Sequence, residues 1–102
     1  MNLRQKKKLG RLARFTSFSD DSNWVSGTCG DYKFEAKLFD EGSCYGIDDG
    51  RVSKLLIVPK NGGFLDAVAL FDRGWDRKPN HEVLFVYQKI MKLLENSPKR
   101  FT

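Results

Sequence analysis

The sequence has few of the residues that build disulfide frameworks or structural metal sites. Its 102 residues include two cysteines, Cys29 and Cys44, and a single histidine, His81. The cysteines do not form a C-x-x-C ligand pair, and a structural zinc site usually needs four Cys or His ligands. We therefore expect reduced thiols in a cytoplasmic protein, a structural or solvent-facing His81, and no metal or cofactor.

Long apolar runs and nucleotide-binding motifs are also missing. No apolar run approaches the roughly 20 residues that a membrane-spanning helix requires, and the charged N-terminus is not followed by the apolar region of a secretory signal. The phosphate-binding patterns G-x-x-x-x-G-K and G-x-G-x-x-G are absent, as is a nucleophile elbow. These absences favour a binding protein over an enzyme, and the length allows one domain.

The positive charge is concentrated at the N-terminus. The net charge is +5, yet residues 1–14 hold six of the 18 Lys and Arg residues and no acid, so the rest of the chain is nearly neutral. A cationic segment attracts polyanions and resists collapse, which predicts either a nucleic-acid-binding arm or a solvated disordered tail. The six predicted nucleic-acid-binding residues are Arg4, Lys6, Lys7, Lys8, Arg11 and Arg14.

Small polar residues at 15–23 predict a linker after this arm. We therefore expect a basic arm and linker over residues 1–23, one α+β domain over 24–97, and a tail over 98–102. Alternating apolar and polar residues predict the strands. The expected strands cover residues 24–29, 32–39, 51–59 and 65–71.

One amphipathic helix is expected at the C-terminal end of the domain. Asn80 has the side chain of an N-cap, and residues 96–98 (Asn-Ser-Pro) stop the helix. Its apolar stripe contains Val83, Tyr87, Ile90, Met91 and Leu94, and Phe85 falls among the polar residues opposite. The predicted fold is a four-stranded antiparallel meander with this helix packed on one face. Apolar residues on the other face then need a cover: the arm, a second copy in a homodimer, or a partner protein. These residues include Val25, Phe39, and either Ala67 with Ala69 or Val68 with Leu70.

The long connection over residues 40–50 is expected to be a lid or a functional loop. In an up-down meander it meets the loop after the last strand, which predicts a neighbourhood of turn residues and ion pairs. The alternative is a Mg²⁺ site for phosphodiester cleavage that uses Asp40, Asp48, Asp49 and Asp72. The full predicted neighbourhood consists of Asp40, Glu41, Asp48, Asp49, Arg51, Asp72, Arg73 and Asp76.

Trp75 is unusual in a short charged loop. It either folds back to cap the core, with Arg73 or Arg77 stacked on it, or forms a hot spot for a protein partner. Phe85 is a second candidate contact residue. The predicted partner-binding set is Asp40, Glu41, Tyr45, Asp48, Asp49, Arg51, Asp72, Arg73, Trp75 and Phe85.

Four segments of the chain resemble a known family. They are W-V-x-G at 24–27, Y-K-F-x-A-K-x-F-D-E-G-S-x-Y-G-I at 32–47, G-R-V-S-K-L at 50–55, and D-R-G-W-D at 72–76. Together they resemble a short uncharacterised domain of Gram-positive bacteria, their phages and mobile elements, over about residues 24–95. The resemblance implies no catalytic residue. It does imply a mobile-element context, in which small proteins often inhibit host defence, as anti-CRISPR proteins do.

The leading hypothesis is a non-enzymatic binding protein, possibly of the anti-CRISPR type, that blocks a nucleic-acid-handling host enzyme such as an RNA-guided nuclease, or its guide RNA. Two alternatives stay open. One is the small metal-dependent nuclease, whose cleavage should be lost on Asp72→Asn. The other is an accessory protein that binds RNA or DNA with little sequence preference through its arm.

Overall fold

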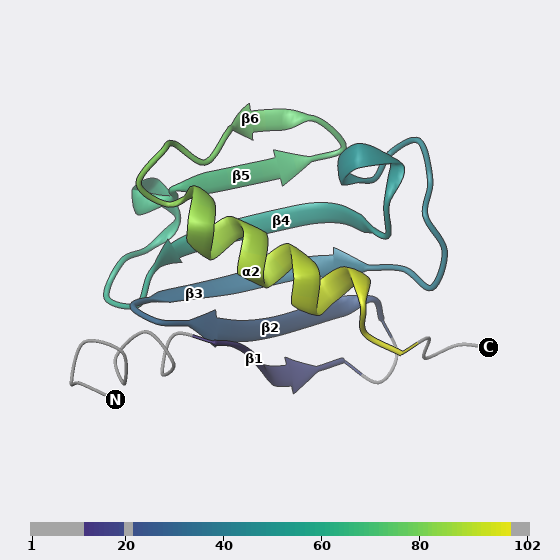
Figure 1. The fold of residues 1–102 in the computed structure, drawn as a ribbon, viewed down its shortest axis with the longest axis horizontal. Helices are drawn as coiled ribbons and strands as arrows, with labels where there is room; N and C mark the ends of the chain where they lie inside the picture. The colour runs from purple at the N-terminus through teal and green to yellow at the C-terminus, as the bar shows by residue number, and fades with distance from the viewer. Residues whose placement is uncertain (1–11, 20–21, 99–102) are drawn as a thin grey trace.

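The computed structural model describes residues 12–19 and 22–98, which form an α+β fold. Six antiparallel strands follow one another in chain order across one sheet, and the helix α2 lies diagonally over one face (Figure 1). Two short 3₁₀ helices, η1 (Ile47–Asp49) and η2 (Phe64–Asp66), lie in the connections on either side of the fourth strand. The elements are β1 (Ala13–Phe18), β2 (Trp24–Cys29), β3 (Tyr32–Leu38), β4 (Val52–Pro59), β5 (Ala69–Asp72), β6 (Trp75–Arg77) and α2 (Leu84–Glu95).

The meander has two more strands than the four predicted. β1 occupies part of the predicted arm and linker, and it pairs with β2 through contacts such as Phe15 opposite Gly27. Phe15 of β1 packs against the core. The sequence did not indicate this, because the neighbours of Phe15 are polar Ser and Thr residues typical of a linker. β6 lies in the predicted charged loop, where Trp75 pairs with Phe71. The sheet therefore begins at residue 13 and not at residue 24.

The segment before β5 was also predicted wrongly. Residues 65–68 are not part of a strand, because the chain after the Gly62–Gly63 turn closes into η2 instead. The Asp66 carboxylate accepts a hydrogen bond from the Gly63 backbone N–H at 3.0 Å. This turn leaves Leu65 94% exposed. β3 and β4, by contrast, match their predictions to within one residue.

The core lies between α2 and the sheet. The alternation predicted for β3 holds: Phe34, Ala36 and Leu38 are buried, and they pack with Ile90 and Leu94 of α2. The helix stripe is thereby confirmed. The Phe34 ring lies against Gly27, where a Cβ atom would collide with that ring and with the Arg14 carbonyl oxygen. A residue without a side chain is therefore required at this point of β2.

Both ends of α2 follow from local signals in the sequence. The Asn80 side chain accepts hydrogen bonds from the backbone N–H groups of Glu82 and Val83, at 3.0 and 3.2 Å. It thus caps a turn that precedes the α-helix, which itself begins at Leu84. The helix ends at Glu95, immediately before the predicted stop. No helix in the described part of the chain is long and apolar enough to span a membrane.

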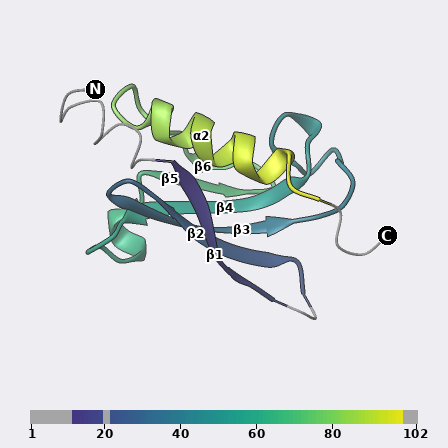
Figure 2. The same cartoon turned by 60° about the horizontal axis from the view of Figure 1, so that its bottom comes forward.

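The face of the sheet opposite α2 is here called the open face. Figure 2 shows the helix on one side of the sheet; on the other side, within the described residues, only the connection that contains η2 extends outward. Val25, predicted for this face, is instead buried under the helix side. By strand alternation and register, the open face presents Trp24, Ser26, Thr28, Lys33, Glu35, Lys37, Lys54, Leu56, Val58, Leu70 and Asp72.

Candidate partner-binding surface

The open face is hollowed along its length by three adjoining depressions. The outer hollow, of about 380 Å³, lies over β1 to β4. The central hollow, of about 260 Å³, lies over β2 to β5, and the loop hollow, of about 640 Å³, lies beside the 39–45 loop. Glu35, Leu56 and Phe64 line both the outer and the central hollow, and Lys54 lines both the central and the loop hollow. The hollows therefore form one continuous strip.

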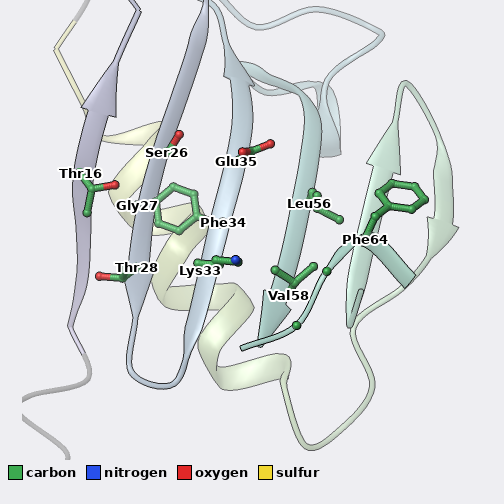
Figure 3. Close-up of a pocket in the computed structure, with 12 residues that line it drawn as sticks. Thr16, Ser26, Gly27, Thr28, Lys33, Phe34, Glu35, Leu56, Val58 and Phe64 are labelled. Atoms are coloured by element: carbon green, nitrogen blue, oxygen red, sulfur yellow. The ribbon is translucent and has the colours of Figure 1, made fainter. Parts of the chain in front are cut away.

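The outer hollow is mostly polar on one side and apolar on the other. Figure 3 shows side chains of four neighbouring strands spread along it, with Thr28 and Lys33 near Val58. The Gly62–Gly63 turn borders it and leads to Phe64. A mixture of hydroxyl groups, one lysine and exposed aliphatic carbon suits an extended ligand better than a compact one.

The central hollow is flanked by two exposed aromatic rings. Trp24 is 41% exposed and Phe64 is 63% exposed, and both line this hollow. Leu56 and Leu70 also line it, as neighbours across β4 and β5. Neither ring was among the predicted site residues. Trp24 could have been predicted from its place in β2, because it precedes the buried Val25 and side chains alternate between the two faces of a strand.

The loop hollow brings together four of the predicted partner-binding residues. Asp40, Glu41, Tyr45 and Arg73 all line it, although the first three lie in the loop after β3 and Arg73 lies in the turn after β5. Lys37, Phe39 and Lys54 complete much of the lining. The Lys37 ammonium lies 5.7 Å from the centre of the Phe39 ring, a cation–π distance.

Two lysines face each other in the sheet beside this hollow. Lys37 of β3 is the direct cross-strand partner of Lys54 of β4. Like charges directly opposite one another destabilise a sheet. Asp72 offsets part of this repulsion, since its carboxylate lies 3.7 Å from the Lys54 ammonium and 3.8 Å from Arg73 Nε. Asp40 and Glu41 line the same hollow, so its three cations, Lys37, Lys54 and Arg73, are accompanied by three carboxylates.

Arg51 does not line any of the three hollows, and its hydrogen bonds lie within the protein. Its Nε donates a hydrogen bond to the Phe39 carbonyl oxygen at 2.8 Å, and a terminal nitrogen donates to the carbonyl oxygens of Glu95 and Ser97, at 3.1 and 2.6 Å. The Arg51 backbone N–H donates to the Glu95 carboxylate, at 2.9 and 3.1 Å to its two oxygens. These bonds fasten the C-terminal end of α2 to the base of the loop.

The predicted lid over residues 40–50 is a tightly folded loop. The backbone N–H groups of Ser43 and Gly46 donate to the carbonyl oxygens of Gly50 and Ser43. Ile47, the first residue of η1, is buried. A Cβ atom on Gly46 would collide with the Gly50 backbone. The loop therefore presents Asp40, Glu41 and Tyr45 from a fixed frame.

The predicted acidic neighbourhood does not form as a single cluster. Asp48 and Asp49 lie in η1 with positive φ angles of 53° and 60°. Burial raises the pKa of the Tyr87 hydroxyl, and the charges of Asp48 and Glu95 raise it further, which places Asp48 near α2. Asp72 belongs to the open face, and Asp76 is exposed in β6. Within residues 12–19 and 22–98, no three Asp, Glu, His or Cys side chains are positioned to hold a metal ion.

Trp75 and Phe85 lie away from this strip. The Trp75 ring packs edge-to-face on Phe71 and Tyr87, and its centre lies 5.1 and 5.6 Å from theirs. It therefore covers the core, as the first of the two interpretations of Trp75 expects. Phe85 is 65% exposed on the outer side of α2, and the Lys89 ammonium lies 4.5 Å from the centre of its ring.

Some of the remaining sequence candidates lie within the residues that the structure describes, and the others lie outside them. Arg14 is exposed in β1, opposite Thr28. Cys29 is buried and Cys44 is exposed, and neither forms a disulfide bond. His81 is exposed in the turn before α2. Five predicted nucleic-acid-binding residues lie outside the described residues: Arg4, Lys6, Lys7, Lys8 and Arg11.

The comparison with protein families matches residues 23–95. This range begins just before β2 and ends with α2, so it contains the three central strands of the open face and the 39–45 loop, and it excludes β1 and the basic N-terminus. The expected range of about 24–95 is thus confirmed. No curated protein and no solved structure matches the chain. The chain belongs to the family described as Domain of unknown function (DUF7678).

Proposed function

We propose that this chain is a non-enzymatic binding protein that targets nucleic acid, either free or held by a nucleic-acid-handling enzyme. One observation carries the proposal: the open face has a continuous strip of hollows lined by lysines and exposed aromatic rings. Surfaces that bind nucleic acid usually combine basic side chains, which contact phosphates, with aromatic rings, which stack on bases. The tight loop and the covered core leave this strip as the surface that a partner would reach.

The basic N-terminus supports the same target. The described chain begins at Leu12, and the next residue, Ala13, pairs with Cys29, beside the Thr28 that lines the outer hollow. The five cations of residues 4–11 precede this point in the sequence. Each phosphate contact that such residues make releases counterions and steepens the dependence of binding on salt.

The finer form of the proposal is an inhibitor, possibly of the anti-CRISPR type. By occupying guide RNA or the channel of an RNA-guided nuclease, such a protein would block the enzyme without chemistry. Asp40 and Glu41 at the loop hollow offer carboxylates that could imitate phosphates to such a channel. The metal-dependent nuclease has no comparable support, because no three Asp, Glu, His or Cys side chains of the described residues are positioned to hold a metal ion.

A pull-down from a bacterial lysate, with and without nuclease treatment, tests the proposal. The wild-type chain should retain nucleic acid or a nucleoprotein. A full-length variant with Arg4, Lys6, Lys7, Lys8 and Arg11 changed to Gln should bind more weakly and with a flatter salt dependence, by up to about 0.9 in the slope of log K for each lost contact to duplex DNA. Retention of neither nucleic acid nor any nucleic-acid-handling protein would contradict the proposal.

A further inference from the structure

We propose that the open face is a binding site for single-stranded nucleic acid, in which Trp24 and Phe64 stack on bases while Lys37 and Lys54, in the cross-strand row beside Trp24, contact a backbone phosphate. This inference rests on the proposed function and narrows its ligand to an unpaired strand. It assigns the site to the sheet face, whereas the sequence had indicated only the N-terminal arm.

The stacking platforms are the exposed rings at the central hollow. Trp24 projects from β2 and Phe64 is brought to the same hollow by η2, so two segments with β3 and β4 between them in the chain supply one pair of rings. Leu56 and Leu70 contribute apolar surface between β4 and β5. Aromatic rings on a sheet bind unpaired bases of any sequence, because every base has a π-face.

The proposed phosphate position lies between the two like-charged side chains of Lys37 and Lys54. Trp24, Lys37 and Lys54 lie side by side across β2, β3 and β4, since Lys37 pairs with Trp24 on one side and with Lys54 on the other. A phosphate placed between the two ammonium groups would remove their mutual repulsion. Arg73 lies next to Lys54 around the loop hollow and offers a further donor to the strand.

A second phosphate position follows along β3. Lys33 projects from the same face as Lys37, four residues earlier, which is about 13 Å at the usual rise of a strand. It lines the outer hollow, where Thr16, Ser26 and Thr28 offer hydroxyl groups. An extended strand laid across the central hollow would thus meet cations at both ends.

The shape and charge of the face favour an unpaired strand over a duplex or a protein. A broad sheet face does not enter the grooves of a duplex, which admit a helix or a two-stranded ribbon. Glu35 lines the central hollow, and Asp40 and Glu41 line the loop hollow at its edge. The strands of the open face carry four cations, Arg14, Lys33, Lys37 and Lys54, against the two carboxylates of Glu35 and Asp72, and Asp72 is paired with Lys54 and Arg73. This excess of cations complements a polyanion.

The test is fluorescence anisotropy with labelled oligonucleotides: single-stranded RNA, single-stranded DNA, and the duplex of the same sequence. Trp24→Ala and Phe64→Ala should each weaken single-strand binding about tenfold. The matched control is Phe85→Ala combined with Lys89→Gln, which removes one exposed ring and one cation from the outer side of α2. The control should bind within about twofold of wild type. Thermal unfolding of each variant establishes that it is folded.

The outcomes separate this inference from the proposed function. If wild type binds the oligonucleotides and the two ring variants bind equally well, the sheet face is not the site, while nucleic-acid binding through the N-terminus stands. An equal loss in the control would overturn the inference in the same way. Wild type that binds no oligonucleotide but retains a nucleic-acid-handling protein in the pull-down would overturn the inference alone.

Discussion

Phe34→Ala is expected to lower the free energy of unfolding by about 3–5 kcal/mol, the range for truncating a fully buried Phe. Phe34 is 1% exposed, and it belongs to the cluster that joins β3 to α2. Its ring also covers Gly27 and lies 6.4 Å from the centre of the Phe15 ring, so its loss opens a cavity where β1, β2 and β3 meet. Gly27 has no side chain to fill that space.

Urea unfolding measures this effect, and Phe85→Ala is the matched control. The same atoms are removed from a ring that is 65% exposed, so the control should change the free energy of unfolding by no more than about 0.5 kcal/mol. A loss below about 1 kcal/mol for Phe34→Ala would mean that the core between α2 and the sheet is not where the structure places it.

Arg51→Ala is expected to cost about 2–3 kcal/mol. Its guanidinium joins Phe39, Glu95 and Ser97, so the substitution leaves three carbonyl oxygens without their charged donor, and the hydrogen bonds to Glu95 and Ser97 are part-buried. Arg51→Lys should recover less than half of the loss, because an ammonium cannot reproduce the planar fork. The effect should concentrate at the loop: the amides of Gly46 and Gly50 should exchange their hydrogens faster than in wild type.

Arg77→Ala provides the comparison for Arg51. Arg77 donates one hydrogen bond, to the Ala67 carbonyl oxygen at 3.2 Å, so its removal should cost clearly less. Equal losses for the two arginines, or unchanged hydrogen exchange in the loop of Arg51→Ala, would show that Arg51 does not fasten the loop to α2.

Strong periodic patterns in the sequence were sufficient to predict the centre of the fold. The alternation from Tyr32 to Leu38, the apolar run of β4 and the stripe of α2 each reflect burial against a neighbouring element, and each was found. β6 was missed because it is only three residues long and two of them are charged, although it pairs with the adjacent β5. β1 was missed because its apolar residues make sense only against their neighbours in the fold. Phe15 reads as an isolated apolar residue until β2 and Phe34 are beside it.

The candidate surface was predictable only in part. Asp40, Glu41 and Arg73 were expected to meet at one edge of the sheet, and they line the same hollow. Arg51 was expected there as well, but no local signal reveals that the end of α2 returns to within hydrogen-bonding distance of it. Phe64 was assigned next to a strand, and only the turn closed by Asp66 carries it onto the open face.

The central claim, that the open face binds an unpaired nucleic-acid strand, is tested most directly by the two tryptophans. Trp24 is exposed on the open face, and Trp75 packs on Phe71 and Tyr87 on the helix side, so each indole reports on one face. In an NMR titration with a single-stranded oligonucleotide, the Trp24 indole N–H signal should shift with saturation while the Trp75 signal stays in place. A titration in which Trp75 moves and Trp24 does not, or in which neither moves although the oligonucleotide binds, would contradict the account.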